Sequence, residues 1–277
     1  MRPMTERQTL IAWRRDPAAM NIADRVLAIA ERVGPSGQRS GLETVSVSWK
    51  GVESQLVYIE ESPLYSRETI VSLDSDVVLV LSMHRSETEM PSLTVHCTGN
   101  IGDAKYGGEP NAVSIAPAAK MKVALAEMKR QSELLGLKYS VSYEVTHHGP
   151  TVDLPIMFLE IGSSHRNWTD PKAGEAVARS ALAATTTISD QADVHVGLGG
   201  PHYAPLFTSL SLREGYCFGH MVSWHRLPDM DEKMLKLLVE RNVGLFRQVV
   251  LDWKGLRKGR DRVVDLLQKE KVPYRRS

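Results

Sequence analysis

Two uninterrupted apolar runs, "DVVLVLSM" (76–83) and "PIMFLEIG" (155–162), constrain the fold most strongly. Runs of this length that are rich in β-branched residues are typical of strands buried on both faces of a largely parallel sheet. Parallel strands need long crossover connections, which are usually helices. Residues 116–136 fit such a helix, because Pro117 stands at its start, Met121, Leu125 and Met128 share one face, and Gly136 follows its end.

The rest of the chain continues this alternation of strands and helices. Residues 9–13, 44–49 and 192–200 read as strands, and residues 17–34, 169–184, 230–242 and 259–271 read as helices. Asp170 and Pro171 form a helix-start pair, with Asp170 as the N-cap. We therefore expect one α/β domain over residues 1–277, with a mixed, mostly parallel sheet flanked by helices on both faces.

Composition and charge exclude some classes of protein. No apolar run approaches the roughly 20 residues that span a bilayer, and the first residues contain no apolar segment of a secretory signal. We expect a cytoplasmic protein without a membrane partner, in which Cys97 and Cys217 are reduced thiols. Residues 254–277 hold nine Lys/Arg and three acidic residues, a net charge of +6. Such a basic tail contacts a polyanion or forms a solvated helix, and the charge alone favours the helix.

Histidines follow predicted strands at several places. His84, His96, the pair His147 and His148, His202 and His220 each stand at or after a strand end, and Glu160 and Ser163 close another strand. Open α/β sheets bind ligands outside the carboxyl ends of their strands. We therefore expect these side chains to meet at one sheet edge. In "THHGPT" we expect one ring to face this crevice and the other to be held by a supporting partner.

Histidine chemistry leaves several types of site open. With a pKa near about 6.5, imidazole serves as base, acid, metal ligand or hydrogen-bond donor. A zinc site can be assembled from histidines that are far apart in the sequence. The candidate metal ligands are His84, His147, His148, His202 and His220. Ser163 is a possible nucleophile, but the chain contains no G-x-S-x-G motif. The glycines of "GLGGPH" can present N–H groups to an anion, without a complete nucleotide-binding motif.

Together, these motifs resemble the archaeal and plant type of D-aminoacyl-tRNA deacylase. The resemblance runs from about Leu10 to Leu251, and "THHGPT" combined with "GGPHYAP" is its most specific part; "HRSE", "LTVHCTGN", "YGGEPN" and "FGHMVS" also contribute. It implies a fold akin to peptidyl-tRNA hydrolases and nucleoside phosphorylases. It also implies zinc as cofactor and hydrolysis of the ester between a D-amino acid and the terminal ribose of tRNA. Leu206 departs from the family pattern, which is often basic there, and so removes one possible phosphate contact.

The resemblance suggests roles for individual residues. Catalysis is expected first from His147 or His148, then from His96 and His202. Further candidates are Asn100 to orient water or the ester carbonyl, Glu160 to hold the α-ammonium group or act as base, and Gly199 and Gly200 as donors to an oxyanion or phosphate. Tyr203 is a candidate to stack on the terminal adenine, although packing within the protein is the favoured role for this ring. Lys254, Arg257 and Lys258 are candidates to meet acceptor-stem phosphates of the D-aminoacyl-tRNA.

Other functions remain open from sequence. A nucleoside phosphorylase-like enzyme or a peptidyl-tRNA hydrolase would use a similar fold. A non-catalytic tRNA-binding module is less compatible with so many histidines, because phosphate binding relies on Lys and Arg. We expect the protein to be a monomer.

Overall fold

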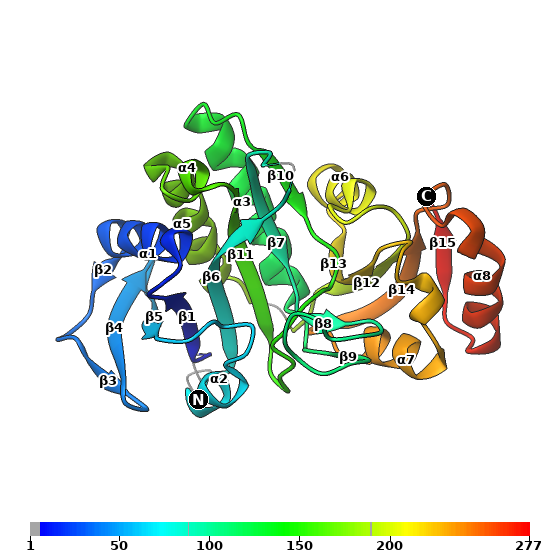
Figure 1. The fold of residues 1–277 in the computed structure, drawn as a ribbon, viewed down its shortest axis with the longest axis horizontal. Helices are drawn as coiled ribbons and strands as arrows, with labels where there is room; N and C mark the ends of the chain where they lie inside the picture. The colour runs from blue at the N-terminus through cyan, green and yellow to red at the C-terminus, as the bar shows by residue number, and fades with distance from the viewer. Residues whose placement is uncertain (1–5, 88, 189) are drawn as a thin grey trace.

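The two apolar runs form neighbouring strands in the middle of a nine-stranded sheet. A computed structural model describes residues 6–87, 89–188 and 190–277 (Figure 1). Strand β6 (Val77–Arg85) pairs in parallel with β11 (Ile156–Ser163) and with β1 (Gln8–Trp13). The strand order is β10-β7-β11-β6-β1-β5-β4-β2, with β3 paired to β4. The remaining strands are β2 (Glu31–Arg32), β3 (Gly37–Arg39), β4 (Leu42–Trp49), β5 (Val52–Ile59), β7 (Ser92–His96) and β10 (Ser140–Tyr143).

Strand directions in this sheet are mixed. Strand β1 is also parallel to β5, and β10 is parallel to β7. However, β7 runs antiparallel to β11, and β4 antiparallel to β5. The predicted α/β fold with a mixed, mostly parallel sheet is confirmed.

Three long helices cover one face of the nine-stranded sheet. Helices α1 (Pro17–Ile29), α3 (Ala118–Leu134) and α5 (Pro171–Thr185) share a core with alternate strand residues such as Leu79 and Leu159. The intervening residues Val80 and Phe158 face the other way, towards Ile70 of α2 (Arg67–Ser72). The predicted helix over 17–34 is too long, because Ala30 leaves the helical conformation and β2 follows. A short helix, α4 (His165–Trp168), precedes α5.

The C-terminal third forms a second sheet that the sequence did not predict. Its order is β13-β12-β14-β15, and all three pairs are parallel. It has its own apolar core, which includes Val196, Leu238, Val249 and Leu267. Its elements are β12 (Asp193–Leu198), α6 (Pro205–Glu214), β13 (Cys217–Val222), η1 (Leu227–Asp229), α7 (Glu232–Glu240), β14 (Leu245–Leu251), η2 (Arg257–Gly259), α8 (Arg260–Lys269) and β15 (Tyr274–Arg276).

The chain that follows β10 joins the two sheets. The Val145 N–H donates to the His202 carbonyl at 2.9 Å, and the Thr146 N–H donates to the Met221 carbonyl at 2.8 Å. A small hairpin of β8 (Gly99–Asn100) and β9 (Ala112–Val113) lies beside this junction (Figure 1). The adjacent histidines 147 and 148 are thereby held between the sheets. Among the described residues, no helix combines the length and apolar character required to cross a bilayer.

Candidate active site

Strands β6, β7 and β11 place three polar side chains on the sheet face opposite α1, α3 and α5. The register pairs Gly162 with His84 of β6, and Phe158 with His96 of β7. Directly paired residues point to the same face, as do residues two apart along one strand. Glu160, between Phe158 and Gly162, therefore projects between the two histidines. A Cβ atom on Gly162 would lie 2.8 Å from His84 Cδ2, so the glycine makes room for this ring.

This arrangement corrects the expectation of a shared carboxyl edge. Because β7 is antiparallel to β11, the carboxyl ends of these two strands point in opposite directions. The histidines meet over one face of the sheet, through the register of three neighbouring strands.

Glu160 is a buried carboxylate between two imidazoles. Its Oε2 lies 3.5 Å from His84 Nδ1 and 3.6 Å from His96 Nε2. Burial raises the pKa of Glu160, but His84 and His96 outweigh this effect and hold the pKa well below its ordinary value. With 3% of its surface exposed, Glu160 is positioned to orient imidazoles and is shielded from a substrate ammonium group.

Glu144 supplies a second carboxylate that is completely buried. Its Oε2 accepts a hydrogen bond from His202 Nε2 at 2.7 Å and lies 3.5 Å from His147 Nε2. Its Oε1 lies 3.2 Å from His84 Nδ1. Burial raises the pKa of Glu144, but the hydrogen bond from His202 and the charges of nearby histidines lower it overall. Since an ionised carboxylate only accepts, the proton of a neutral His202 sits on Nε2, and Nδ1 is left as an acceptor.

His84 connects both carboxylates to Tyr203. Its Nε2 lies 2.9 Å from the Tyr203 hydroxyl, while Nδ1 faces Glu144 and Glu160. Burial lowers the pKa of His84, but the two carboxylates outweigh this effect and raise the pKa to about 10. A charged imidazole at this position neutralises part of the negative charge that the two carboxylates bring into the interior.

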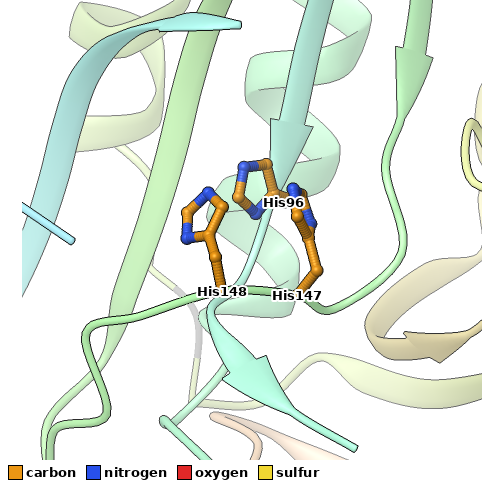
Figure 2. Close-up of side chains that lie close together, drawn as sticks. All are labelled: His96, His147 and His148. Carbon is orange, nitrogen blue, oxygen red and sulfur yellow. The ribbon is translucent and has the colours of Figure 1, made fainter. Parts of the chain in front are cut away.

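His96, His147 and His148 form a compact group of three imidazoles (Figure 2). Their ring centroids are 4.3–4.8 Å apart. Each Nδ1 faces a backbone carbonyl oxygen: that of Cys97 at 3.3 Å, Val145 at 2.8 Å and Gly149 at 2.6 Å, respectively. A carbonyl only accepts, so each Nδ1 carries the proton and each Nε2 of a neutral ring keeps its lone pair.

Both members of the His147–His148 pair face His96, so the expectation that only one ring faces the site is wrong. His148 has a φ of +44°, in the left-handed region that non-glycine residues rarely adopt. This backbone conformation brings its ring to the same side as that of His147.

The three-imidazole group fits a zinc ion. Its ligand nitrogens lie within 4.8 Å of one another, and the buried His96 Nε2 has no hydrogen-bond partner among the residues that the structure describes. Burial and neighbouring imidazoles lower the pKa of His147, and the pKa of His148 falls to about 4, which favours the neutral form that a metal requires. Burial lowers the pKa of His96 but Glu160 raises it overall, so a proton competes with a cation there. Hydrogen bonds from Nδ1 to fixed acceptors are typical of zinc-bound histidines.

Two further groups of potential ligands overlap with this one. They are Glu144 with His147 and His202, and His84 with Glu144 and Glu160. His220 does not join any of these groups. Its Nδ1 lies 3.0 Å from Thr146 Oγ1, and its Nε2 lies 3.1 and 3.0 Å from the carbonyls of Ser114 and Arg241. His220 is therefore occupied as a structural residue in the interior, which removes it from the predicted ligands.

Asn100, Gly199 and Gly200 also have structural partners. The Asn100 side-chain amide donates to the carbonyls of Gly107 at 2.9 Å and Glu109 at 3.2 Å. The N–H groups of Gly199 and Gly200 donate to the carbonyls of Val222 at 2.8 Å and Gly255 at 3.3 Å. The amide expected to orient water or the ester carbonyl, and the two N–H groups expected to bind an oxyanion or phosphate, are thus used to hold loops beside the site.

The remaining predicted residues have three different placements. Tyr203 lies within the site, in contact with His84. Ser163 donates its hydroxyl hydrogen to the Met90 carbonyl at 2.9 Å, so it is not prepared as a nucleophile. Lys254, Arg257 and Lys258 lie outside the histidine cluster, in the chain that follows β14.

Glu144 was the main omission from the sequence-based set of site residues. It precedes His147 by three residues and follows a strand. This spacing was the sequence feature that could have indicated Glu144 as a partner of the histidines. Asp16 was also missed: it caps α1 and accepts the Met83 N–H at 2.8 Å, immediately before His84. Burial raises the pKa of Asp16 to about 6.

Solved structures support the fold. The crystal structure of a conserved protein of unknown function, AF0625, superposes with a TM-score of 0.87 at 25% identity, covering 98% of this chain and 95% of that one. A purine nucleoside phosphorylase from Toxoplasma gondii gives a TM-score of only 0.40, so kinship to phosphorylases stays a prediction.

Sequence comparisons identify the family. A model described as D-aminoacyl-tRNA deacylase matches residues 71–275. A protein of this name from Methanosarcina acetivorans is 34% identical over 94% of this chain and 89% of its own length. Another, from Thermococcus kodakarensis, is 38% identical over 68% of each chain. The chain belongs to the D-aminoacyl-tRNA deacylase family.

Proposed function

We propose that the histidine cluster hydrolyses the ester between a D-amino acid and the terminal ribose of tRNA, releasing the free D-amino acid and tRNA. The observation that carries this proposal is His202, whose side chain is 42% exposed while its Nε2 is bound to the fully buried Glu144. A carboxylate behind an accessible imidazole is the arrangement of a general base.

Ester hydrolysis requires a proton to leave the attacking water. With Nε2–H held by Glu144, His202 presents Nδ1 to the site and can accept this proton. Glu144 then stabilises the imidazolium that forms, because its charge lies 2.7 Å away. Tyr203 lies on the other side of His84 and offers a hydroxyl group to the ester carbonyl or the ribose.

We propose that His96, His147 and His148 hold a zinc ion. When bound, zinc lowers the pKa of water and polarises carbonyl groups. Glu160 then acts on His84 as an orienting carboxylate, while its Oε2 lies 3.6 Å from the His96 nitrogen that would bind the ion. The backbone acceptors of the three Nδ1 atoms fix the direction of each ligand, independent of the substrate.

The test measures amino-acid release from D-tyrosyl-tRNA and L-tyrosyl-tRNA, with and without a chelator. The proposal predicts release from the D form only, and a loss of rate after chelation that added zinc restores. Equal release from both forms would reject chiral selection, and unchanged rates after complete removal of metal would reject a catalytic zinc ion.

Two further substrates separate the alternatives. Preference for an N-blocked aminoacyl-tRNA would indicate a peptidyl-tRNA hydrolase. Phosphate-dependent cleavage of purine nucleosides would indicate a phosphorylase. Tight binding of tRNA without any ester hydrolysis would indicate a binding module.

A further inference from the structure

The carboxyl ends of the four-stranded sheet gather basic and aromatic side chains. The four strands are parallel, so the chain segments that follow them lie at one edge. Trp224 follows β13, and Arg276 belongs to the last strand, β15. The segment after β14 contributes Trp253, Lys254, Arg257 and Arg260. We call these six residues the basic edge. Figure 1 places this sheet at the opposite end of the molecule from β4 and β5.

Guanidinium groups lie over the tryptophan rings of the basic edge. The Arg257 guanidinium carbon is 3.8 Å from the centroid of the Trp224 ring. Those of Arg260 and Arg276 are 4.4 and 4.0 Å from the Trp253 ring. RNA-binding proteins stack bases on such aromatic and guanidinium planes, and this contact tolerates any base.

Three cations of the basic edge have no carboxylate partner among the described residues. In the described parts of the chain, no carboxylate oxygen lies within 4.0 Å of the side-chain nitrogens of Lys254, Arg257 or Arg260. By contrast, Arg226 pairs with both Asp103 and Asp229. Positive charge left without a carboxylate partner is suited to phosphate groups.

The backbone of Arg257 adopts a conformation that is unusual for a long side chain. Its φ is +53°, a left-handed conformation that glycine adopts without cost. A long side chain in this conformation is locally unfavourable, and such residues concentrate at functional sites. However, Lys50 shares this conformation, with a φ of +50°, so the backbone of Arg257 does not mark a binding site but makes Arg257 suited to replacement by glycine.

One turn connects the basic edge to the active site. The Gly200 carbonyl accepts the Trp224 N–H at 3.0 Å, and the Gly200 N–H donates to the Gly255 carbonyl at 3.3 Å. His202 follows two residues later and donates to Glu144. A nucleotide bound at the basic edge would thus lie next to the site that cleaves the ester.

We propose that the basic edge binds the single-stranded 3′ end of tRNA, just before the esterified adenosine, by stacking its bases and neutralising its phosphates. This inference rests on the proposed function. Lys254 and Arg257 were already expected from the sequence to meet tRNA phosphates. The inference adds Trp224, Trp253, Arg260 and Arg276, and it assigns single-stranded RNA as the ligand of all six residues.

The test compares Arg257→Gly and Trp224→Leu with a matched control, Lys50→Gly. Lys50 also has a left-handed φ, +50°, and its Nζ lies 5.7 Å from the centroid of the Trp49 ring, at the other end of the molecule. Arg257→Gly is expected to keep or raise the melting temperature, because glycine suits the backbone there. Trp224→Leu keeps an apolar side chain against the core and removes the aromatic ring that stacks on His225 and lies under the Arg257 guanidinium.

Binding of uncharged tRNA is measured as a function of salt, together with hydrolysis of D-tyrosyl-tRNA and of D-tyrosyl-adenosine, which lacks the rest of the RNA. We expect both variants to weaken tRNA binding about 10-fold, and Arg257→Gly to lower the salt slope by about 1. We also expect KM for D-tyrosyl-tRNA to rise about 10-fold more than KM for D-tyrosyl-adenosine. Lys50→Gly should match the wild type throughout.

Unchanged tRNA affinity in both variants would overturn the proposal, as would equal effects on the two substrates or an equal loss in Lys50→Gly. If the wild type releases no amino acid from either substrate, the proposed function fails. Binding of uncharged tRNA would then still confirm or reject the basic edge.

Discussion

Replacing Glu144 with glutamine tests the role of the buried carboxylate with almost no change of shape. Glu144 is fully buried and accepts the His202 Nε2–H at 2.7 Å. The side-chain amide of the Glu144→Gln variant can donate as well as accept. If it donates to His202 Nε2, the imidazole proton moves to Nδ1, and the nitrogen that faces the site no longer accepts a proton.

The size of the effect follows from this change of tautomer. A positioned general base contributes about 10²–10⁴ to a rate, and the wrong tautomer removes most of that contribution. We therefore expect kcat for D-tyrosyl-tRNA to fall by about 10²–10⁴. KM should change by less than about threefold, because a fully buried side chain makes no uniform contact with substrate.

The assay is the steady-state rate of D-tyrosine release as a function of D-tyrosyl-tRNA concentration, combined with ¹⁵N NMR of the His202 ring to identify its protonated nitrogen. Zinc content must be measured in parallel, because Glu144 Oε2 also lies 3.5 Å from His147 Nε2. The His202→Ala variant is the matched control. Adding Glu144→Gln to it should lower kcat only a little further, since the two residues act as a unit. A rate within about fivefold of the wild type, with the tautomer reversed, would refute His202 as the base.

Three other perturbations probe the surroundings of the site. Gly162→Ala places a Cβ 2.8 Å from His84 Cδ2, so we expect a loss of about 1–3 kcal/mol in unfolding free energy, with lower kcat, measured by thermal unfolding and single-turnover rates. His96→Ala should weaken zinc binding more than about 10-fold in competition with a chromophoric chelator, while the protein stays folded. Burial raises the pKa of Asp16 to about 6, so the folded state holds a proton that the unfolded chain loses near pH 4. Stability should therefore fall as pH rises from about 4 to 6, by about 3 kcal/mol, and urea unfolding of Asp16→Asn at pH 4 and pH 7 should lack this fall.

Local signals in the sequence predicted most of the first sheet and its helices. Continuous apolar runs identified β6 and β11, and the Asp170-Pro171 pair located the start of α5, where Asp170 accepts the Lys172 N–H. The division into two sheets was not predictable in this way. It depends on strand pairing over long sequence separations, and the short β15 carries little apolar pattern of its own.

Which histidines lie close together was better predicted than how the fold brings them together. His84, His96, His147, His148 and His202 were all expected, and they do meet. They were expected to meet at the carboxyl ends of parallel strands. However, β7 is antiparallel to β11, and the sequence does not reveal this direction. Like the others, His220 stands at or after the end of a predicted strand, and its three buried hydrogen-bond partners distinguish it from them.

The adjacent histidines offer the most direct test of the account. A folded His147→Ala, His148→Ala double variant should release D-tyrosine from D-tyrosyl-tRNA at least about 10³-fold more slowly than the wild type, since it loses two of three proposed zinc ligands. Release at the wild-type rate by that variant would return both imidazoles to a structural role and contradict the proposed site.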